Sequence, residues 1–418
     1  MSEMTISRVE QRFRAQTPRS AALFREAQAL LPGGLTRSTL QVEPYPVALA
    51  TGSGATVTDV DGNTYIDLVN NYTALVHGNA HPAITTAVAE RFAQGASLAS
   101  PHATQIRLAE LIVGRLPSAE LVRFTNSGSE AATLAVRIAR RATGRRKLVM
   151  FEGGYHGTGI PFADPDYEVV TVPYNDVGAA AKAIGTGIAA VFAEPFLGAG
   201  GVSPADPGFL ASVQELCKKT SALFVLDEVQ SLRNSTGGAQ AADGLLPDLT
   251  LMGKVIGGGL PIGAVAGRRD LLALTDATRT NALSHSGTMN GHLAAMVAGA
   301  VSLELLTEDA ITQLVTRAGG LAAAIHSAGA ATGLPVTVTS AGSILNVHFS
   351  PRAPHDYREV TATDTSLLRD LYLGLLNRGV YTTPRGMINL STVLTEAELA
   401  TVADAYAQVF AEVAAELP

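Results

Sequence analysis

Short apolar stretches alternate with amphipathic ones through the middle of the chain, from about Pro82 to Leu306. The apolar stretches are bounded by Gly, Pro or Asp and predict strands at Val122–Thr125, Lys147–Phe151, Glu168–Val172, Ile188–Ala193 and Leu223–Leu226. Helical spacing predicts helices at His102–Arg115, Glu130–Thr143, Val177–Ile184, Gly208–Thr220 and Gly291–Leu306. This alternation indicates an α/β fold with a mostly parallel sheet, in which ligands bind beyond the carboxyl ends of the strands.

The two ends of the chain follow a different pattern. Near the N-terminus we expect a helix over Ser7–Leu31, and two strands within Ala55–Asp67 joined by an Asp-Gly turn. The last third predicts strands near Val336–Val338 and Ile344–Phe349, and helices at Asp309–Ala328, Leu367–Asn377 and Leu394–Leu417. We therefore expect residues 76–310 to form a large domain, with residues 1–75 and 311–418 together forming a smaller α+β domain.

Composition narrows the class of protein but not its chemistry. The chain has 418 residues, 47% of them apolar and 16% charged, which is typical of a globular protein with a large core. The net charge of −7 argues against non-specific nucleic-acid binding, and no apolar run reaches the ~20 residues needed to span a bilayer. The single Cys217 excludes an internal disulfide, and the polar N-terminus lacks a secretory signal. We expect a cytoplasmic protein.

An apolar strand that ends in two carboxylates is the strongest chemical signal. Leu223–Leu226 leads directly into Asp227, so this carboxylate lies at the edge of a core, where it is costly unless paired. Further along, Lys254 lies among apolar residues and precedes the glycines at 257–259. Apolar surroundings lower the pKa of an amine and make it nucleophilic. The pair suits an aromatic cationic cofactor, with the acid on a ring nitrogen and the lysine on an aldehyde.

Other strand ends carry polar groups that could converge on the same crevice. Asn126–Glu130 joins a strand to a helix and could bind an anion through free N–H groups, although an ordinary helix cap would look the same. Gly153–Gly157 could place Tyr155 and His156 against a planar ligand, or be a turn with a buried tyrosine. Glu194 closes the next strand.

The remaining candidates lie in loops. Ser284–Thr288 offers a second anion site rich in hydroxyl groups. Arg37 and Arg385 could bind carboxylates, although a surface arginine is the default for each, and Tyr72 could face a substrate or be a core tyrosine. We expect no metal site: His77 and His81 have the spacing of a helical metal pair, but the nearby Gly78 and Pro82 oppose a helix there.

Six short motifs in this order resemble the class III, or omega, aminotransferases, which are pyridoxal-phosphate enzymes of fold type I. The motifs are Asn126–Ala131, Gly154–Gly157, Ala193–Pro195, Asp227–Val229, Gly253–Gly259 and Ser286–Thr288. The resemblance implies pyridoxal 5'-phosphate as cofactor, and a large domain whose seven-stranded, mostly parallel sheet is flanked by helices. It also implies a homodimer with active sites at the interface.

The resemblance also implies a role for each matched residue. Lys254 would form the Schiff base with the cofactor and carry protons, and Asp227 would pair with the ring nitrogen. Tyr155 and Val229 would contact the two faces of the ring, and Glu194 would lie near its hydroxyl side, with His156 also in the cofactor site. The phosphate would be held by Ser127, Gly128 and Ser129, with Thr288 reaching in from the second subunit.

Within the class, the chain is most similar to transaminases of beta-amino acids and to glutamate-1-semialdehyde 2,1-aminomutase. The aminomutases have a long gating loop where this chain has only Thr158–Tyr167 before the next strand, and Gln230–Ser231 replaces the family's common Met-Thr. Arg37 and Arg385 match the positions that bind substrate carboxylates in the beta-amino acid transaminases. These features favour the transaminase.

We therefore predict an aminotransferase with a ping-pong mechanism. Its donor would be a carboxylate-bearing amine such as a beta-amino acid, its acceptor a keto acid such as 2-oxoglutarate or pyruvate, and Arg37, Arg385 and Tyr72 would line the substrate site. Two alternatives stay open. The aminomutase would need no external keto acid, and an inactive pyridoxal-phosphate-binding protein would bind the cofactor without any half-reaction.

Overall fold

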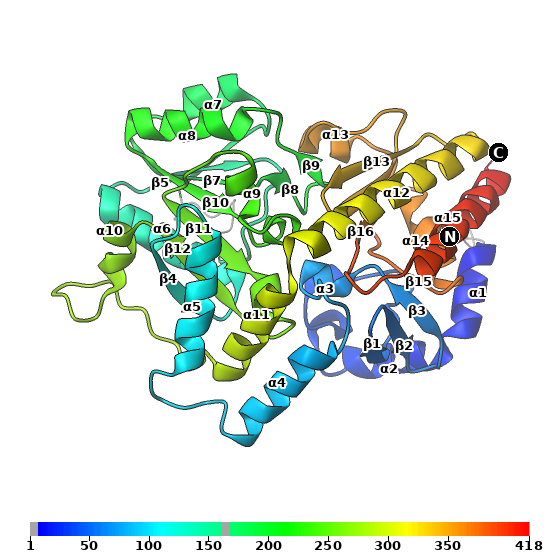
Figure 1. Cartoon of the computed structure of the whole chain (residues 1–418). Helices are drawn as coiled ribbons and strands as arrows, with labels where there is room; N and C mark the ends of the chain where they lie inside the picture. The colour runs from blue at the N-terminus through cyan, green and yellow to red at the C-terminus, as the bar shows by residue number, and fades with distance from the viewer. Residues whose placement is uncertain (1–6, 160–167, 418) are drawn as a thin grey trace.

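A seven-stranded sheet forms the centre of the larger lobe in the computed structural model, which describes residues 7–159 and 168–417 (Figure 1). Across the sheet the strands are β4 (Leu121–Thr125), β12 (Gly263–Gly267), β11 (Leu249–Gly253), β10 (Leu223–Asp227), β7 (Ile188–Ala193), β5 (Lys147–Phe151) and β6 (Val169–Val172). Strand β12 runs antiparallel to both of its neighbours, and all other adjacent pairs are parallel. The predicted α/β class and mostly parallel seven-stranded sheet are confirmed.

Alternate residues of the strands face different helices, as a period of two requires. On one face, Leu148 and Met150 of β5 pack with the Ala-rich side of α6 (Gly128–Thr143). On the other, Val149 and Phe151 pack with α7 (Val177–Ala183) and α8 (Phe209–Thr220). Because both faces are covered, the central strands are apolar throughout, which is why they were readable as short apolar runs.

The smaller lobe contains segments from both ends of the chain. One sheet joins β1 (Leu49–Ser53), β2 (Thr56–Asp59), β3 (Thr64–Asp67) and β15 (Val380–Tyr381), with β15 parallel to β3. Another joins β13 (Val336–Ala341), β14 (Ile344–Phe349) and β16 (Met387–Asn389), and a short hairpin joins β8 (Phe196–Leu197) to β9 (Ser203–Pro204). The domain boundaries at residues 75 and 310 stay a prediction.

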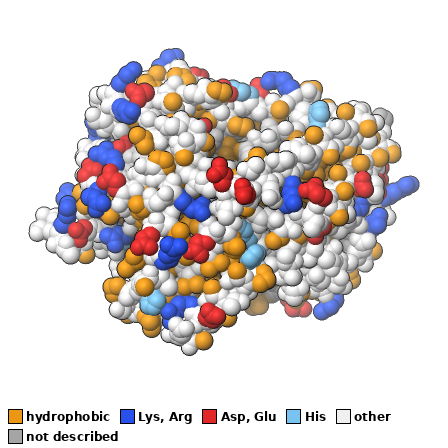
Figure 2. All heavy atoms as spheres, in the orientation of Figure 1, with side chains coloured by type: hydrophobic (Ala, Val, Ile, Leu, Met, Phe, Trp, Pro, Cys, Tyr) orange, Lys and Arg blue, Asp and Glu red, His pale blue; other side chains and the backbone are white. Residues whose placement is uncertain are grey.

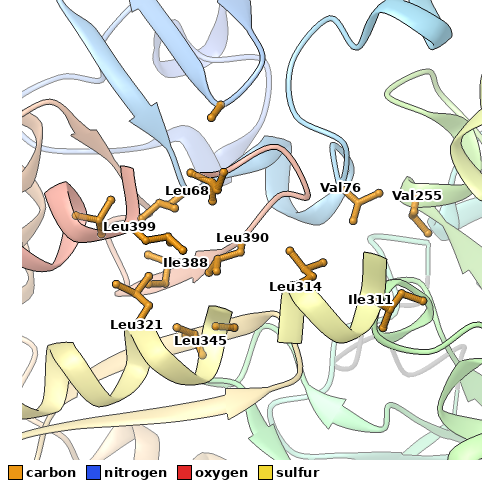
Figure 3. Close-up of a cluster of buried hydrophobic side chains, with 14 of the residues drawn as sticks. Leu68, Val76, Val255, Ile311, Leu314, Leu321, Leu345, Ile388, Leu390 and Leu399 are labelled. Atoms are coloured by element: carbon orange, nitrogen blue, oxygen red, sulfur yellow. The ribbon is translucent and has the colours of Figure 1, made fainter. Parts of the chain in front are cut away.

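One large hydrophobic cluster connects the two lobes. It includes Leu68 from the N-terminal sheet, Val255 beside the seven-stranded sheet, and Leu314 and Leu399 from the C-terminal helices (Figure 3). Its helices are α11 (Leu293–Leu305), α12 (Glu308–Thr332), α14 (Leu368–Leu376) and α15 (Glu396–Glu416), with α5 (Ala103–Arg115) at the edge of the larger lobe. A shared core of this kind holds the lobes in a fixed relation.

The expected N-terminal helix over Ser7–Leu31 is wrong in one respect. The structure has two helices there, α1 (Arg8–Gln16) and α2 (Pro18–Gln28). Pro18 has no N–H to continue the first helix, and it stands at the start of the second, where that N–H is not needed.

Five further helices complete the described chain: α3 (Asn70–Thr73), α4 (Pro82–Ala93), α9 (Gly238–Ala242), α10 (Arg269–Leu272) and α13 (Tyr357–Thr361). Throughout the described ranges, each helix is too short or too polar to cross a membrane.

The packing of α11 against the turn after β11 gives a test of this arrangement. A methyl group at Gly299 would overlap the main-chain carbonyl of Ile256, and would also crowd Leu108. Gly299→Ala should therefore lower the free energy of unfolding by about 2 kcal/mol, measured by urea titration.

The matched control is Gly320→Ala, on the exposed side of α12, where an added methyl group meets nothing within 4 Å. Alanine has the higher helix propensity, so this change should add about 0.8 kcal/mol to the stability. Equal effects of the two changes would contradict the proposed packing of α11.

Candidate active site

A cavity of about 420 Å³ opens at the carboxyl edge of the seven-stranded sheet. Most of the predicted site residues line it: Arg37, Tyr72, Ser127, Gly128, Ser129, Tyr155, His156, Glu194, Asp227, Val229 and Lys254. Apart from Arg37 and Tyr72, which come from the smaller lobe, they follow different strands of this sheet, and the parallel order of those strands brings them to one place. Arg385 and Thr288 do not line this cavity.

Asp227 ends β10, with only 5% of its surface exposed. Its Oδ2 accepts a hydrogen bond from His156 Nδ1 at 2.8 Å, and its Oδ1 accepts one from the Val229 N–H at 3.0 Å. Burial alone would lower the pKa of His156, but the carboxylates of Asp227 and Glu194 outweigh burial and raise it. The pair presents a buried, oriented acid at the bottom of the cavity.

Glu194 lies beside Asp227 because β7 and β10 are neighbours and Leu226 is opposite Ala193 in their register. Its carboxylate accepts from the N–H groups of Tyr155, at 2.9 Å, and Gly198, at 3.3 Å. Burial, reinforced by Asp227 and opposed by His156, raises its pKa to about 7. Glu194 can therefore hold or release a proton near neutral pH.

Lys254 follows β11 directly and begins a tight turn, Lys254–Gly257. Its φ of 51° lies in the left-handed region, which a non-glycine residue rarely adopts without a functional reason. Burial lowers the pKa of its amine to about 8, against the opposite influence of Asp227 and Glu194. The amine is therefore far more available as a nucleophile than an exposed lysine.

The N-terminus of α6 forms an anion site on another wall of the cavity. Ser127 caps the helix by accepting from the Glu130 N–H at 3.2 Å. Among the residues described, no acceptor faces the N–H groups of Gly128 and Ser129. Free N–H groups at the start of a long helix attract an anion, as phosphate sites do.

Two side chains lie where they could flank a planar ring. Tyr155 is 48% exposed, and its main chain is fixed by the bond to Glu194. Val229 packs close to Gly128, where an added methyl group would come within 3.2 Å of the valine side chain. Their contact with the two ring faces stays a prediction.

Two guanidinium groups from opposite ends of the chain lie against the ring of Tyr72. The Cζ atom of Arg37 is 5.2 Å from the centre of the Tyr72 ring, and that of Arg385 is 5.8 Å from it. Arg385 lines an adjoining cavity of about 350 Å³, which shares Tyr72 with the first. The structure thus brings the two predicted arginines together at Tyr72, on the side of the cavity formed by the smaller lobe.

Several residues of the cavity were not among the predicted site residues, although Gln230 had been noted as a departure from the family motif. Gln230 lines the wall next to Val229, and its Oε1 is buried without a hydrogen-bond partner among the residues described. Asn71 and Ile262 also line it. The replacement of Met by Gln230 in the family motif was a usable signal, whereas Asn71 carried none.

Comparison with known proteins identifies the family. A family model for class III aminotransferases matches residues 38–161 and 160–413. Over 398 residues the chain is 39% identical to the beta-phenylalanine transaminase of Variovorax paradoxus, covering 93% of this chain and 92% of that one. The chain belongs to the class III aminotransferases.

Two further likenesses agree with this. A crystal structure of the beta-phenylalanine aminotransferase from Variovorax paradoxus superposes with a TM-score of 0.94 at 38% identity, covering 98% of this chain and 97% of that one. A glutamate-1-semialdehyde 2,1-aminomutase of Anaeromyxobacter dehalogenans is 38% identical over 428 residues, covering 96% of this chain and 99% of that one. This aminotransferase therefore has fold type I and is pyridoxal-phosphate-dependent, as predicted.

The cavity of the aminotransferase fits that cofactor. The buried carboxylate of Asp227 matches a ring nitrogen that carries a proton, and the low pKa of Lys254 matches an aldehyde. The free N–H groups of Gly128 and Ser129 match the phosphate. His77, considered above as half of a helical metal pair, is held in the core, where its two ring nitrogens contact Thr392 Oγ1 and the Ser302 carbonyl.

The pKa of Lys254 gives a pH test on the cofactor-free protein. Only the neutral amine attacks an aldehyde, so the uptake rate of pyridoxal phosphate should rise with pH and reach half its maximum near pH 8. An ordinary lysine, with a pKa of 10.5, would place this midpoint well above that. The rate is measured by the change in cofactor absorbance.

Arg385→Gln provides the control, because Arg385 is one of the positive charges that lower the pKa of Lys254. Its removal should move the midpoint to higher pH. A midpoint that stays the same in this variant, or that matches a free lysine in the unaltered protein, would contradict the electrostatic description of the site.

Proposed function

We propose that this aminotransferase moves an amino group from a carboxylate-bearing amine, above all a beta-amino acid, to a keto acid such as 2-oxoglutarate or pyruvate, by a ping-pong mechanism. One observation carries the proposal. The guanidinium groups of Arg37 and Arg385 both lie against the ring of Tyr72, which lines the cavity, and among the described residues neither pairs with a carboxylate.

Arg385 is the stronger of the two anchors. Its Nε is buried without a partner among the described residues, and its Nη2 contacts the weak acceptor Met387 Sδ at 3.3 Å. Burial lowers its pKa from the ordinary value, which reflects the cost of desolvating the charge. A substrate carboxylate would supply the missing partner through two parallel hydrogen bonds.

Arg37, which also lies against the Tyr72 ring, would assist. It is exposed, and its Nη2 donates to Asn71 Oδ1 at 2.8 Å, which leaves further donors for a ligand. The likeness to a beta-phenylalanine transaminase supports a beta-amino acid as donor. Both substrates of such an enzyme carry a carboxylate, so one set of arginines can serve the donor and then the acceptor.

The residues of the main cavity would each have a separate role in the reaction. When bound, pyridoxal phosphate supplies an aldehyde for the amino group and a ring that withdraws electrons from the reacting carbon. Asp227 would hold a proton on the ring nitrogen, and Lys254 would move a proton at the reacting carbon. Tyr155 and Val229 would hold the ring between them, and Glu194 would lie near its hydroxyl side. His156 would orient Asp227, and Ser127, Gly128 and Ser129 would bind the phosphate.

A homodimer would complete the phosphate site. Thr288 lies in an exposed segment, Ser286–Met289, outside the cavity of its own chain. Apolar side chains are exposed nearby on α4 and α5, including Phe92 and Ile106, and Figure 2 shows apolar side chains over this region. Such a surface suits a second copy that would bring Thr288 to the neighbouring site. A cytoplasmic location also stays a prediction.

The aminomutase is the second candidate, because one is 38% identical over nearly its whole length. The predicted difference between the two was the short stretch Thr158–Tyr167, most of which lies outside the described residues. The arginines favour the transaminase instead. The need for an acceptor separates the two functions.

A half-reaction tests the proposal. A beta-amino acid added to the holoenzyme without a keto acid should change the cofactor absorbance once, and 2-oxoglutarate or pyruvate should restore it. Lys254→Ala should abolish both changes, because the group that moves the proton is gone. Isomerisation of glutamate 1-semialdehyde without an acceptor would identify the aminomutase instead, and cofactor binding without any half-reaction would identify an inactive protein.

Arg385→Gln tests the carboxylate anchor. Loss of a charge-assisted hydrogen bond costs about 2 kcal/mol, so KM for a beta-amino acid should rise roughly thirtyfold. The KM for an amine of similar skeleton without a carboxylate should change little, as should kcat with either donor. An equal rise for both donors would show that Arg385 does not bind the carboxylate.

A further inference from the structure

Arg233 is a fully buried cation outside the cofactor cavity. It lies on the short turn Ser231–Asn234, which follows the catalytic strand β10, and only 1% of its surface is exposed. All four hydrogen-bond acceptors that it contacts are neutral. Its Nε donates to Ser343 Oγ at 2.9 Å, and its Nη2 donates to the Leu390 carbonyl. Its Nη1 donates to Asn389 Oδ1 at 3.2 Å and to the Thr73 carbonyl at 3.4 Å. Burying a guanidinium without a carboxylate partner lowers the stability of the fold, so we expect Arg233 to provide a compensating structural or functional benefit.

One of these partners ends a strained segment. The turn Asn70–Thr73 (α3) has left-handed main-chain angles, with φ values of 45°, 45°, 55° and 76° at its successive residues. None of the four is glycine, and the left-handed conformation costs about 1–2 kcal/mol for each such residue. A turn of this kind persists only where its surroundings hold it.

The start of the turn is held by Asp67 and Asn389. Asp67 Oδ1 accepts from the N–H groups of Val69 and Asn70, each at 2.9 Å. Asn389 Nδ2 donates to the Val69 carbonyl at 3.0 Å, and the Asn389 carbonyl accepts from Asn70 Nδ2 at 2.7 Å. All of these groups are buried, so water cannot replace them.

Arg233 acts at both ends of the turn. At the far end, it donates directly to the Thr73 carbonyl. At the near end, it fixes the orientation of the Asn389 amide: a guanidinium only donates, so Asn389 must present its oxygen to Arg233 and its nitrogen to Val69. One buried side chain thus connects the catalytic strand to the whole left-handed turn.

The turn carries two groups of the substrate side. The ring of Tyr72 contacts the guanidinium groups of both Arg37 and Arg385, and its hydroxyl donates to the Thr39 carbonyl at 2.7 Å. Asn71 Oδ1 accepts from Arg37 Nη2 at 2.8 Å. A shift of the turn would therefore move the tyrosine and one of the two arginines together.

We propose that Arg233 is a positioning residue for substrate binding: it braces the left-handed turn Asn70–Thr73 and so keeps Tyr72 and Arg37 where a carboxylate can be bound. This role rests on the proposed function. The alternative is that Arg233 only satisfies buried carbonyl groups, and that role would affect stability alone.

The test compares two donors in the half-reaction of the holoenzyme, so that no keto acid enters. One donor is a beta-amino acid and the other is an amine of the same skeleton without the carboxylate. Arg233→Met should weaken the apparent affinity for the first about tenfold more than for the second, because small displacements of a binding group cost that much. Binding of a carboxylic acid without an amino group, measured by calorimetry, should weaken by the same factor.

Two further variants separate positioning from stability. Arg115→Met removes another guanidinium that donates to main-chain carbonyls, those of Leu303 and Leu306, away from the site. It should lower thermal stability without changing the preference for the carboxylate. In an Arg37→Gln background, Arg233→Met should reduce that preference less than it does alone, since the two residues then act on the same contact.

Asn71→Gly covers the case in which Arg233→Met does not fold. Asn71 is exposed, and glycine adopts its positive φ freely, so only the bond to Arg37 is lost. The carboxylate preference should fall in this variant too.

The outcomes distinguish the two proposals. If the unaltered enzyme shows no carboxylate preference, the proposed substrate class is wrong. If it shows one that Arg37→Gln removes and Arg233→Met does not reduce, Arg233 has no positioning role. If Arg233→Met does not fold and Asn71→Gly leaves the preference unchanged, the turn does not position Arg37 and the proposal is wrong.

Discussion

The site depends on one buried carboxylate. Asp227 ends the central strand of the seven-stranded sheet and cannot be left unpaired there, and His156 Nδ1 meets this need at 2.8 Å. The strands on either side of β10 are β7 and β11, so Glu194 and Lys254, which follow them, necessarily arrive beside the carboxylate. Sheet order alone therefore brings an acid, a second acid and an amine to one edge.

The order of the strands around Asp227 explains which parts of the site could be predicted from the sequence. The residues that line the cofactor side of the cavity could be predicted because they follow short apolar strands, and parallel strands end at the same edge of a sheet. Strands β11 and β12 were not predicted, and for β12 the reason is that its sequence of Gly, Ala and Val lacks the usual bulky strand residues. Its small residues are required where it packs: a methyl group at Gly263 would overlap the main chain of Ser127, in the anion site.

The arrangement of Arg37, Tyr72 and Arg385 on the proposed substrate side of the cavity was harder to predict, for a physical reason. Arg37, Arg385 and Tyr72 were candidates, but the turn that places Tyr72 against both guanidinium groups has left-handed angles at non-glycine residues, against local preference. Besides the nearby Asp67, contacts from distant parts of the chain, Arg233 and Asn389, stabilise it. Propensity describes what a segment does alone, so a conformation imposed by tertiary contacts leaves little trace in the local sequence.

The cofactor side and the proposed substrate side of the cavity also differ in what they indicate about the choice between transaminase and aminomutase. Both reactions need the same cofactor and the same proton transfer, so Lys254 and Asp227 cannot distinguish them. A ping-pong enzyme admits two carboxylates in turn to one site, so one set of cationic groups would serve both substrates. Two guanidinium groups lie against Tyr72, and one of them, that of Arg37, is bonded to the braced turn through Asn71. The proposed choice of the transaminase therefore rests on segments of the smaller lobe and not on the cofactor site.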